Sequence, residues 1–341
     1  MNVGYSVSKL KAMIESNNKG NRAYALDKSD IREFTKVTDA IRQVKYAGAV
    51  MYRGKIHLLG GDSYATRHEV YNPDTDTWAD SVTLPTYFGQ GMSVVYNDEI
   101  HILNSANATS YYKIHYKFDG EKWTKLSDTP QGLIHGSAVV YEGKLHIIGG
   151  GDNNAKLHYT WNEDTDTWTR LNDLPLDANY CTAFVLTNEI HLIWSKSHYK
   201  WNKDTDSWTN VDSGLTASLN DYWGVCVYND VAYAVLSNTS ALTIRQYLPD
   251  KNLWGGVSGD TAIVRCYKPN MVVCNNDIYI FTANNTKEVY RYRIRTKLVG
   301  EVDKNTFIYS PNKLNVIQGE LQDVEKGYIA TEDTSVVIYE K

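Results

Sequence analysis

The sequence predicts an all-β fold, namely a ring of six four-stranded sheets, or six-bladed β-propeller. The first supporting observation is a repeat of six related strings: YRGKIHLLGG, YNDEIHILNS, YEGKLHIIGG, LTNEIHLIWS, YNDVAYAVLS and CNNDIYIFTA. Their sixth residues are spaced by 44, 45, 45, 42 and 46 residues, at His57, His101, His146, His191, Tyr233 and Tyr279. The second observation is an aromatic residue followed seven residues later by tryptophan in five units, from Tyr71 and Trp78 to Tyr247 and Trp254. Repeats of this period are typical of propellers.

Each unit predicts four short strands, because runs of β-branched and aromatic residues alternate with turn residues. In the third unit we expect strands over residues 136–141 and 145–150, a third strand ending near Trp161 and a fourth at Trp168. The 26 tyrosines and 9 tryptophans suit half-buried sheet surfaces. One such sheet cannot bury both faces unless neighbouring sheets cover them, so we expect the units to pack as blades.

The repeated units resemble the kelch family over roughly residues 30 to 300. The resemblance rests on paired glycines after the second strand, Gly60-Gly61 and Gly149-Gly150, followed by the tyrosine and tryptophan at a set distance. The other units depart from it at the glycine pair, with Asn104-Ser105, Trp194-Ser195, Leu236-Ser237 and Thr282-Ala283. The sixth unit also lacks the tryptophan. The resemblance implies a propeller fold, with ligand contacts near the channel mouth.

The same spacing predicts how the ring closes. Trp78, Trp123 and Trp168 each precede the next repeat histidine by 23 residues, and Phe34 stands 23 residues before His57. We therefore expect residues 31–37 to be a fourth strand that completes the last blade and hides both sheet edges. In the alternative interpretation, residues 298–302 supply that strand.

Two extensions are predicted outside the propeller, which we place at residues 30–303. Residues 1–29 contain Val7, Leu10, Met13 and Ile14 at helical spacing, which predicts a short amphipathic helix. This helix could lie on the propeller edge or attach the chain to a partner. Residues 304–341 alternate apolar and polar side chains at 314–317 and 335–339, which predicts a β-hairpin tail. The tail string KGYIATEDTSVVIYEK is similar to terminal segments of bacteriophage tail-associated proteins.

Composition excludes several classes of protein. The 35 Lys plus Arg against 40 Asp plus Glu give a net charge of −5, spread along the chain, so we expect no nucleic-acid partner. No apolar run approaches the roughly 20 residues of a membrane helix. The first 30 residues lack a signal-peptide core, so synthesis in the cytoplasm without export is expected. The cysteines Cys181, Cys226, Cys266 and Cys274 form no CxxC pair, which predicts reduced, buried thiols.

A ligand site is expected at the mouth of the central channel. Loops between strands two and three and between successive blades are the long, variable ones, and such loops often carry function. The residues eleven before each repeat position mark this mouth at Tyr46, Gln90, His135, Tyr180, Tyr222 and Lys268. The candidate ligand-binding residues are Tyr46, Phe88, Gln90, His135, Tyr180, Tyr222, Trp223, Arg265 and Tyr267. Aromatic and amide groups suit stacking on sugar rings, whereas the alternative is that they only cap contacts between blades.

The histidines do not predict a metal site. His57, His101, His146 and His191 share one sheet position, and His68, His158 and His198 share another. Because equivalent positions on different blades lie far apart, we expect no joint metal site and no cofactor. The repeated strings NPDTDTW, NEDTDTW and NKDTDSW are interpreted as Asx turns, because a calcium site would need about six to eight oxygen ligands.

The preferred functional interpretation is a non-catalytic binding or structural module. It would belong to a phage or phage-tail-like particle, with protein partners in that assembly and a surface glycan as a further partner. One alternative is an intracellular kelch adaptor that binds a peptide. The other is a kelch-type, epimerase-like carbohydrate enzyme, for which His135, Asp221 or Arg265 could act as acid or base near the channel. No GxSxG, P-loop or dinucleotide motif favours catalysis.

Overall fold

The chain forms two compact units, Phe34–Tyr292 and a second made of Met1–Glu33 with Arg293–Lys341. The computed structural model describes residues 22–61, 66–107, 110–151, 156–211, 214–215, 223–236, 242–262, 269–282, 286–303 and 337–340. Within these ranges, no helix has the length and apolarity that crossing a membrane would require.

The larger unit contains six blades, each with strands ordered from a first to a fourth, and the third and fourth strands of the last blade continue into the smaller unit. The first strands are β2 (Gly48–Tyr52), β6 (Met92–Tyr96), β10 (Ser137–Tyr141), β14 (Thr182–Leu186), β18 (Trp223–Tyr228) and β22 (Asn270–Cys274). The second strands are β3 (Lys55–Leu59), β7 (Glu99–Ala106), β11 (Lys144–Ile148), β15 (Glu189–Trp194), β19 (Val231–Leu236) and β23 (Asp277–Phe281). The third strands are β4 (His68–Asn72), β8 (Tyr111–Phe118), β12 (His158–Asn162), β16 (Ser197–Asn202), β20 (Leu242–Leu248) and β24 (Val289–Asp303). The fourth strands are β5 (Thr77–Asp80), β9 (Trp123–Lys125), β13 (Thr167–Arg170), β17 (Ser207–Val211), β21 (Leu253–Ala262) and β1 (Arg22–Lys36). A short 3-10 helix, η1 (Pro249–Lys251), joins β20 to β21.

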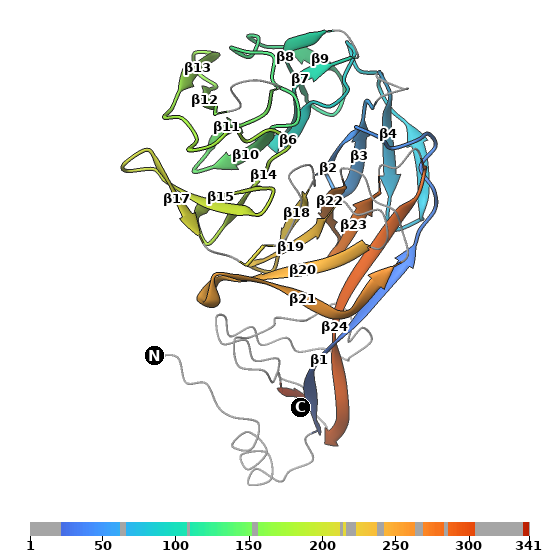
Figure 1. Cartoon of the computed structure of the whole chain (residues 1–341). Coiled ribbons are helices and arrows are strands. Elements are labelled where there is room, and N and C mark those ends of the chain that lie inside the picture. Colours follow the sequence, from blue (N-terminus) through green and yellow to red (C-terminus); the bar gives the residue numbers. More distant parts are fainter. Residues whose placement is uncertain are drawn as a thin grey trace. The chain divides into compact units, whose positions relative to one another are not determined.

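The six blades close into a ring. Each first strand contacts the first strands of both neighbouring blades, in the cyclic order β2, β6, β10, β14, β18, β22 and back to β2. Figure 1 shows these first strands gathered around the centre, with the later strands of each blade further out. The predicted six-bladed propeller is therefore confirmed.

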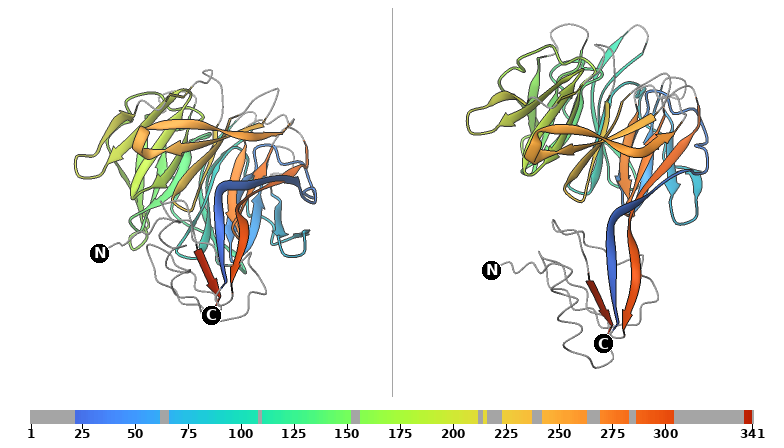
Figure 2. Two further views of the ribbon diagram at one scale, coloured as in Figure 1. Left: turned by 90° about the horizontal axis from the view of Figure 1, so that it is seen from below. Right: turned by 60° about the horizontal axis from the view of Figure 1, so that its bottom comes forward.

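The last blade is completed by the N-terminal strand, as the spacing of Phe34 predicts. The sixth sheet is five-stranded, with the order β22-β23-β24-β1-β25, so that β1 stands in the fourth position of the blade. Figure 2 shows β1 running beside β24 in both views. Beyond the end of β1, the Val37 N–H donates to the Val289 carbonyl at 3.1 Å. Residues 298–302 belong to β24 itself, so the alternative closure by that segment is wrong.

The apolar core of this unit is divided among the interfaces between blades. Second strands are buried along nearly their whole length, as in β3, whereas fourth strands such as β5 are largely exposed. One cluster joins Tyr52 and Leu59 of the first blade to Ile100, Ile102 and Phe118 of the second. Because each blade supplies only half of a core, the blades depend on one another for burial of apolar surface.

The acidic turns between third and fourth strands fasten neighbouring blades together. The Asn72 side chain accepts the Asp74 N–H at 3.1 Å, which confirms the predicted Asx turn. The last aspartate of the turn does more than that. Asp166 accepts the indole N–H of Trp161 at 3.0 Å and the backbone N–H of Ser127, in the preceding blade, at 2.8 Å. Such turn aspartates therefore connect neighbouring blades through hydrogen bonds.

In the smaller unit, β25 (Val337–Glu340) pairs antiparallel with the start of β1, with Arg22 opposite Glu340 and Ala25 opposite Val337. The predicted N-terminal helix and the first strand of the predicted hairpin, at residues 314–317, lie outside the described residues. The domain boundaries at residues 30 and 303 stay predictions.

Candidate binding site at the channel

Four of the predicted mouth residues occupy one repeated backbone position, directly before or near a first strand. Tyr46, Gln90, His135 and Tyr180 have left-handed φ values of 58°, 60°, 59° and 61°. Such values are uncommon for residues other than glycine, so their recurrence marks one shared turn. The Gln90 N–H donates to the Tyr46 carbonyl, and the His135 N–H donates to the Gln90 carbonyl, each at 3.2 Å. Main-chain bonds thus link the first three blades at the mouth.

Side chains from three of these positions converge. The ring centroids of Tyr46 and His135 are 5.8 Å apart, and those of His135 and Tyr180 are 4.1 Å apart. The Lys45 ammonium lies 5.1 Å from the centroid of the Tyr46 ring. His135 is buried, whereas Tyr46 and Tyr180 are half-buried. We call Tyr46, His135 and Tyr180 the mouth cluster; it offers aromatic faces and phenol groups from the first, third and fourth blades.

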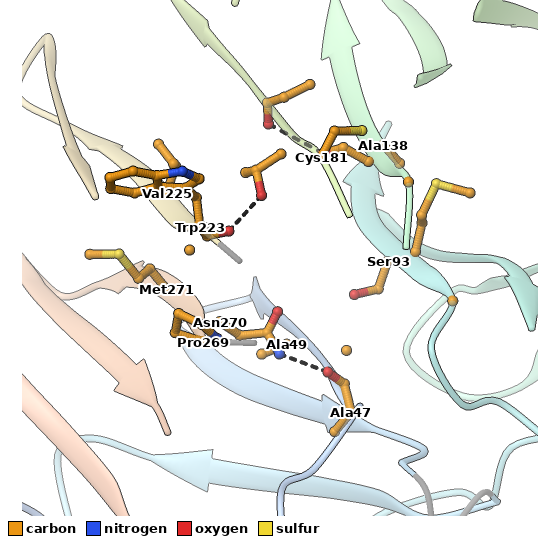
Figure 3. Close-up of a pocket in the computed structure, with 18 residues that line it drawn as sticks. Ala47, Ala49, Ser93, Ala138, Cys181, Trp223, Val225, Pro269, Asn270 and Met271 are labelled. Atoms are coloured by element: carbon orange, nitrogen blue, oxygen red, sulfur yellow. Dashed lines mark hydrogen bonds between the residues drawn. The ribbon is translucent and has the colours of Figure 1, made fainter. Parts of the chain in front are cut away.

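A cavity of about 190 Å³ lies on the axis of the ring, and the residues that line it directly follow the mouth residues in the sequence. Its wall is made by three consecutive residues at the start of each first strand, so all six blades contribute (Figure 3). None of these lining residues carries a charge. At about 30 Å³ for each water molecule, the cavity has room for roughly six waters or one small polar molecule.

Polar side chains on this wall connect some of the neighbouring blades. The Thr182 hydroxyl donates to the Trp223 carbonyl at 2.5 Å, and the Asn270 amide donates to the Ala47 carbonyl at 2.7 Å. The second bond joins the last blade to the first, and Figure 3 shows both. These bonds hold the wall in place and leave hydroxyl and amide oxygens as acceptors beside the cavity.

The remaining predicted site residues lie differently. Phe88 is fully buried in the core between the first two blades, so its side chain presents no surface to a ligand. Trp223 is one of the residues that line the cavity, but its side chain is buried, and its indole N–H donates to the Ser195 carbonyl at 2.8 Å. Tyr222, Arg265 and Tyr267 lie outside the described residues.

The sequence interpretation missed that the two histidine sets belong together within each blade. His57 Nδ1 lies 2.7 Å from His68 Nε2, and the same contact recurs in the next three blades. The other pairs are His101–His115 at 2.8 Å, His146–His158 at 3.0 Å and His191–His198 at 2.9 Å. In each pair the third-strand histidine lies two residues before the residue opposite its partner, which makes the two diagonal neighbours. Strand register was the signal that could have revealed the pairs. His115 was missed because Trp123 pairs with Phe118, five residues before it, and not with Tyr116, seven residues before it.

Burial keeps these rings neutral. Desolvation lowers the pKa of His57 to about 3 and that of His68 to about 4. The pKa values of His101 and His115 fall to about 4 and about 3 for the same leading cause. The described residues contain no group of three histidine, cysteine or acidic side chains placed to hold a metal ion.

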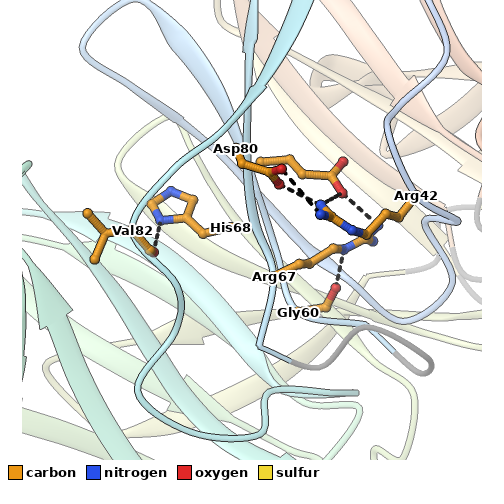
Figure 4. Close-up of polar contacts among 7 residues, drawn as sticks. Arg42, Gly60, Arg67, His68, Asp80 and Val82 are labelled. Carbon is orange, nitrogen blue, oxygen red and sulfur yellow. Dashed lines mark hydrogen bonds and ion pairs between the residues drawn. The ribbon is translucent and has the colours of Figure 1, made fainter.

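An ionic cluster in the first blade joins the buried Arg67 and Glu69 to the more exposed Arg42 and Asp80 (Figure 4). Arg42 donates to Glu69 at 2.8 Å and to Asp80 at 2.6 Å, and the bond to Asp80 is the main cause that raises the pKa of Arg42. Arg67 donates to the Gly60 carbonyl and lies 3.6 Å from Glu69. Because Arg42 belongs to the connection from β1 to β2, this cluster fixes the closing segment to the first blade.

Comparison with known proteins supports the fold alone. No family model matches the chain, and no curated protein matches it. Among solved structures, one titled "Structure of YjhT" is similar, with a TM-score of 0.60 and 13% sequence identity. The match covers 77% of this chain and 99% of that one.

Proposed function

We propose that this propeller is a non-catalytic binding module of a phage or phage-tail-like particle, and that its channel mouth recognises a carbohydrate on the host surface. The mouth cluster carries the proposal. Its three rings converge beside a wall that holds hydroxyl and amide groups but no charge. Aromatic faces with neutral hydrogen-bonding groups match the apolar faces and hydroxyl groups of a sugar.

The site supports binding better than catalysis. Sugar epimerisation needs an acid and a base on opposite sides of one carbon. Of the candidates His135, Asp221 and Arg265, only His135 belongs to the residues that the structure describes, and it lies between two aromatic rings. The two terminal extensions and the phage-like terminal string are the sequence features behind the assignment to a particle. Protein partners would be supplied by that particle.

A glycan array with the purified chain tests the ligand class. Tyr46→Ala and Tyr180→Ala should each weaken glycan binding about fivefold to tenfold, since an aromatic contact contributes about 1 kcal/mol. Tyr111→Ala is the matched control, because Tyr111 is an exposed tyrosine on β8 that does not belong to the mouth cluster. Unchanged binding in both folded mouth variants, or no glycan bound by the wild-type chain, would refute the carbohydrate site.

Two further measurements separate the alternatives. Incubation with bound sugars in D₂O should incorporate no deuterium at carbon, whereas incorporation would indicate the epimerase-like enzyme. The native chain should sediment with a large particle from producing cells. Its recovery only as a lone monomer, or capture of a peptide at the mouth, would contradict the particle assignment.

A further inference from the structure

The His–His pairs occur as complete units. The first four blades have histidine at both positions, and the last two blades have it at neither. Blade five has Tyr233 with Ile244 at these positions, and blade six has Tyr279 with Val289. Because the two positions change together, the second histidine is not an incidental sheet residue.

The partners of the first pair define where its protons are. His68 Nδ1 lies 3.0 Å from the Val82 carbonyl, which can only accept, so this nitrogen carries the proton. His68 Nε2 is therefore the acceptor for the N–H at Nδ1 of His57. Both rings are neutral in this arrangement. Two added protons would place two N–H donors against each other across 2.7 Å, which breaks the bond.

Each pair packs against the next blade. The third-strand histidine of each pair contacts the third-strand aromatic ring of the following blade, edge to face. These contacts are His68–Phe118 at 5.1 Å, His115–Trp161 at 4.8 Å, His158–Trp201 at 5.0 Å and His198–Tyr247 at 4.9 Å. The two interfaces of blade six instead have tyrosine contacts, Tyr233–Tyr292 at 6.5 Å and Tyr71–Tyr279 at 5.5 Å.

Few groups near the pairs could stabilise an added positive charge. Lys55, Lys117, Lys144 and Lys200 act on the pairs as like charges. The acidic groups are Asp206, which acts on His146, and Glu189, whose carboxylate lies 3.9 Å from His191. The titratable rings in contact with the pairs are Tyr52, Tyr96, Tyr141 and Tyr247. An added positive charge on a pair would therefore lie chiefly beside lysines and aromatic rings.

We propose that the four His–His pairs form an acid-operated switch that opens the interfaces from blade one to blade five while blade six keeps both of its interfaces. A doubly protonated pair loses its internal bond and holds positive charge against an aromatic ring, so separation of the two blades, which admits water, becomes favourable. The closing blade and its neighbours remain joined because their contacts do not titrate near neutral pH.

The direction of the pH effect follows from linkage. Solvated histidines bind protons below about pH 6.5, whereas the paired histidines of the first two blades bind them only near pH 3 to 4. The opened state therefore takes up more protons between these values. Interface stability is complete above pH 6.5 and is lost as the pH falls towards 4.

Hydrogen–deuterium exchange at pH 7, 5 and 4, corrected for intrinsic exchange rates, tests the switch. Amides of β7, β11 and β15 should lose protection before those of β23. Simultaneous loss in all blades, or earlier loss in β23, would overturn the proposal. So would paired histidines whose NMR signals titrate near pH 6.5 while protection stays unchanged.

A blade swap supplies the matched variant. His191→Tyr with His198→Ile copies the solution that blade five already uses, and it should move opening between blades four and five to lower pH by several tenths of a unit. His146→Tyr with His158→Ile should do the same one interface earlier, and serves if the first variant does not fold. Tyr233→Phe, at the equivalent position of blade five, should leave the acid midpoint unchanged. Double variants with the wild-type midpoint would contradict the switch.

Discussion

The aromatic ring of Phe34 stacks on that of Tyr290, with centroids 4.9 Å apart and planes inclined by 20°. The two residues belong to β1 and β24, which come from opposite ends of the chain. Four residues after Phe34, the backbone N–H of Thr38 donates to the Asp76 carboxylate at 3.0 Å, and its carbonyl accepts the indole N–H of Trp78 at 3.0 Å. Ser127 makes the same two contacts with the third blade. The N-terminal segment therefore functions as an ordinary fourth strand.

Removal of the Phe34 ring should weaken this closure. Phe34 is half-buried, so Phe34→Ala should lower the free energy of unfolding by about 1 to 2 kcal/mol through lost stacking and lost apolar contact. Urea unfolding followed by circular dichroism measures the change. Phe34→Trp installs the residue that the other blades use and should retain most of the stability. An alanine variant as stable as the wild type would show that the stacking does not support closure.

The two hydrogen bonds that Asp166 accepts give a second mutational test. Asp166→Ala leaves the Trp161 indole N–H and the Ser127 amide without their acceptor, which should cost about 1 to 3 kcal/mol. Asp164→Ala, in the same turn but exposed, should cost less than about 0.5 kcal/mol. Thermal or urea denaturation compares the two variants. Equal effects would mean that the turn stabilises the fold without a specific contribution from the hydrogen bonds of Asp166.

Repetition explains why the fold could be predicted from the sequence. The distance from tryptophan to the next repeat position fixed the blade period, and one departure from tryptophan, at Phe34, identified the closing strand. The repeated turn position of Tyr46 and Tyr180 also followed from this spacing. The spacing did not predict which of these side chains are buried. Phe88 lies only two residues before Gln90, yet its side chain is fully buried in the core between blades.

The His–His pairs escaped prediction for a different reason. A sequence places His57 and His68 eleven residues apart, and only the register of β3 against β4 makes them diagonal neighbours. In the second blade the turn from β8 to β9 is two residues shorter, so the ring opposite Trp123 is Phe118 and not Tyr116, which stands seven residues before it. His115 lies three residues before Phe118, as His68 lies before Tyr71, and the wrong aromatic anchor hid this equivalence. Contacts that depend on register and turn length require the backbone geometry.

The glycine pair of the first blade should tolerate no side chain at its first position. Gly60 has a φ of +62°, and an added Cβ would lie 1.8 Å from the Phe88 carbonyl oxygen. Gly54 has a similar φ of +75°, but an added Cβ meets nothing within 4 Å. Gly54→Ala should therefore cost only the backbone term of about 1 to 2 kcal/mol, and Gly60→Ala should cost clearly more. Equal losses in urea unfolding would show that the approach of the next blade does not restrict Gly60.

Thiol labelling at pH 8 should report whether the ring is closed. Burial raises the pKa of Cys274 to about 11 and also raises that of Cys226, so only a small fraction of either thiol is the reactive thiolate at pH 8. Cys181 is buried too, and Cys266 lies outside the described residues, so the experiment uses a Cys266→Ser background. The three remaining thiols should react with a disulfide reagent slowly in the native protein and rapidly in urea.

In the Phe34→Ala variant, Cys274 should react faster, because it belongs to the core cluster shared by the sixth and first blades. Rapid labelling of native Cys274 in the wild-type ring would contradict its burial there, whereas Phe34→Trp should restore slow labelling.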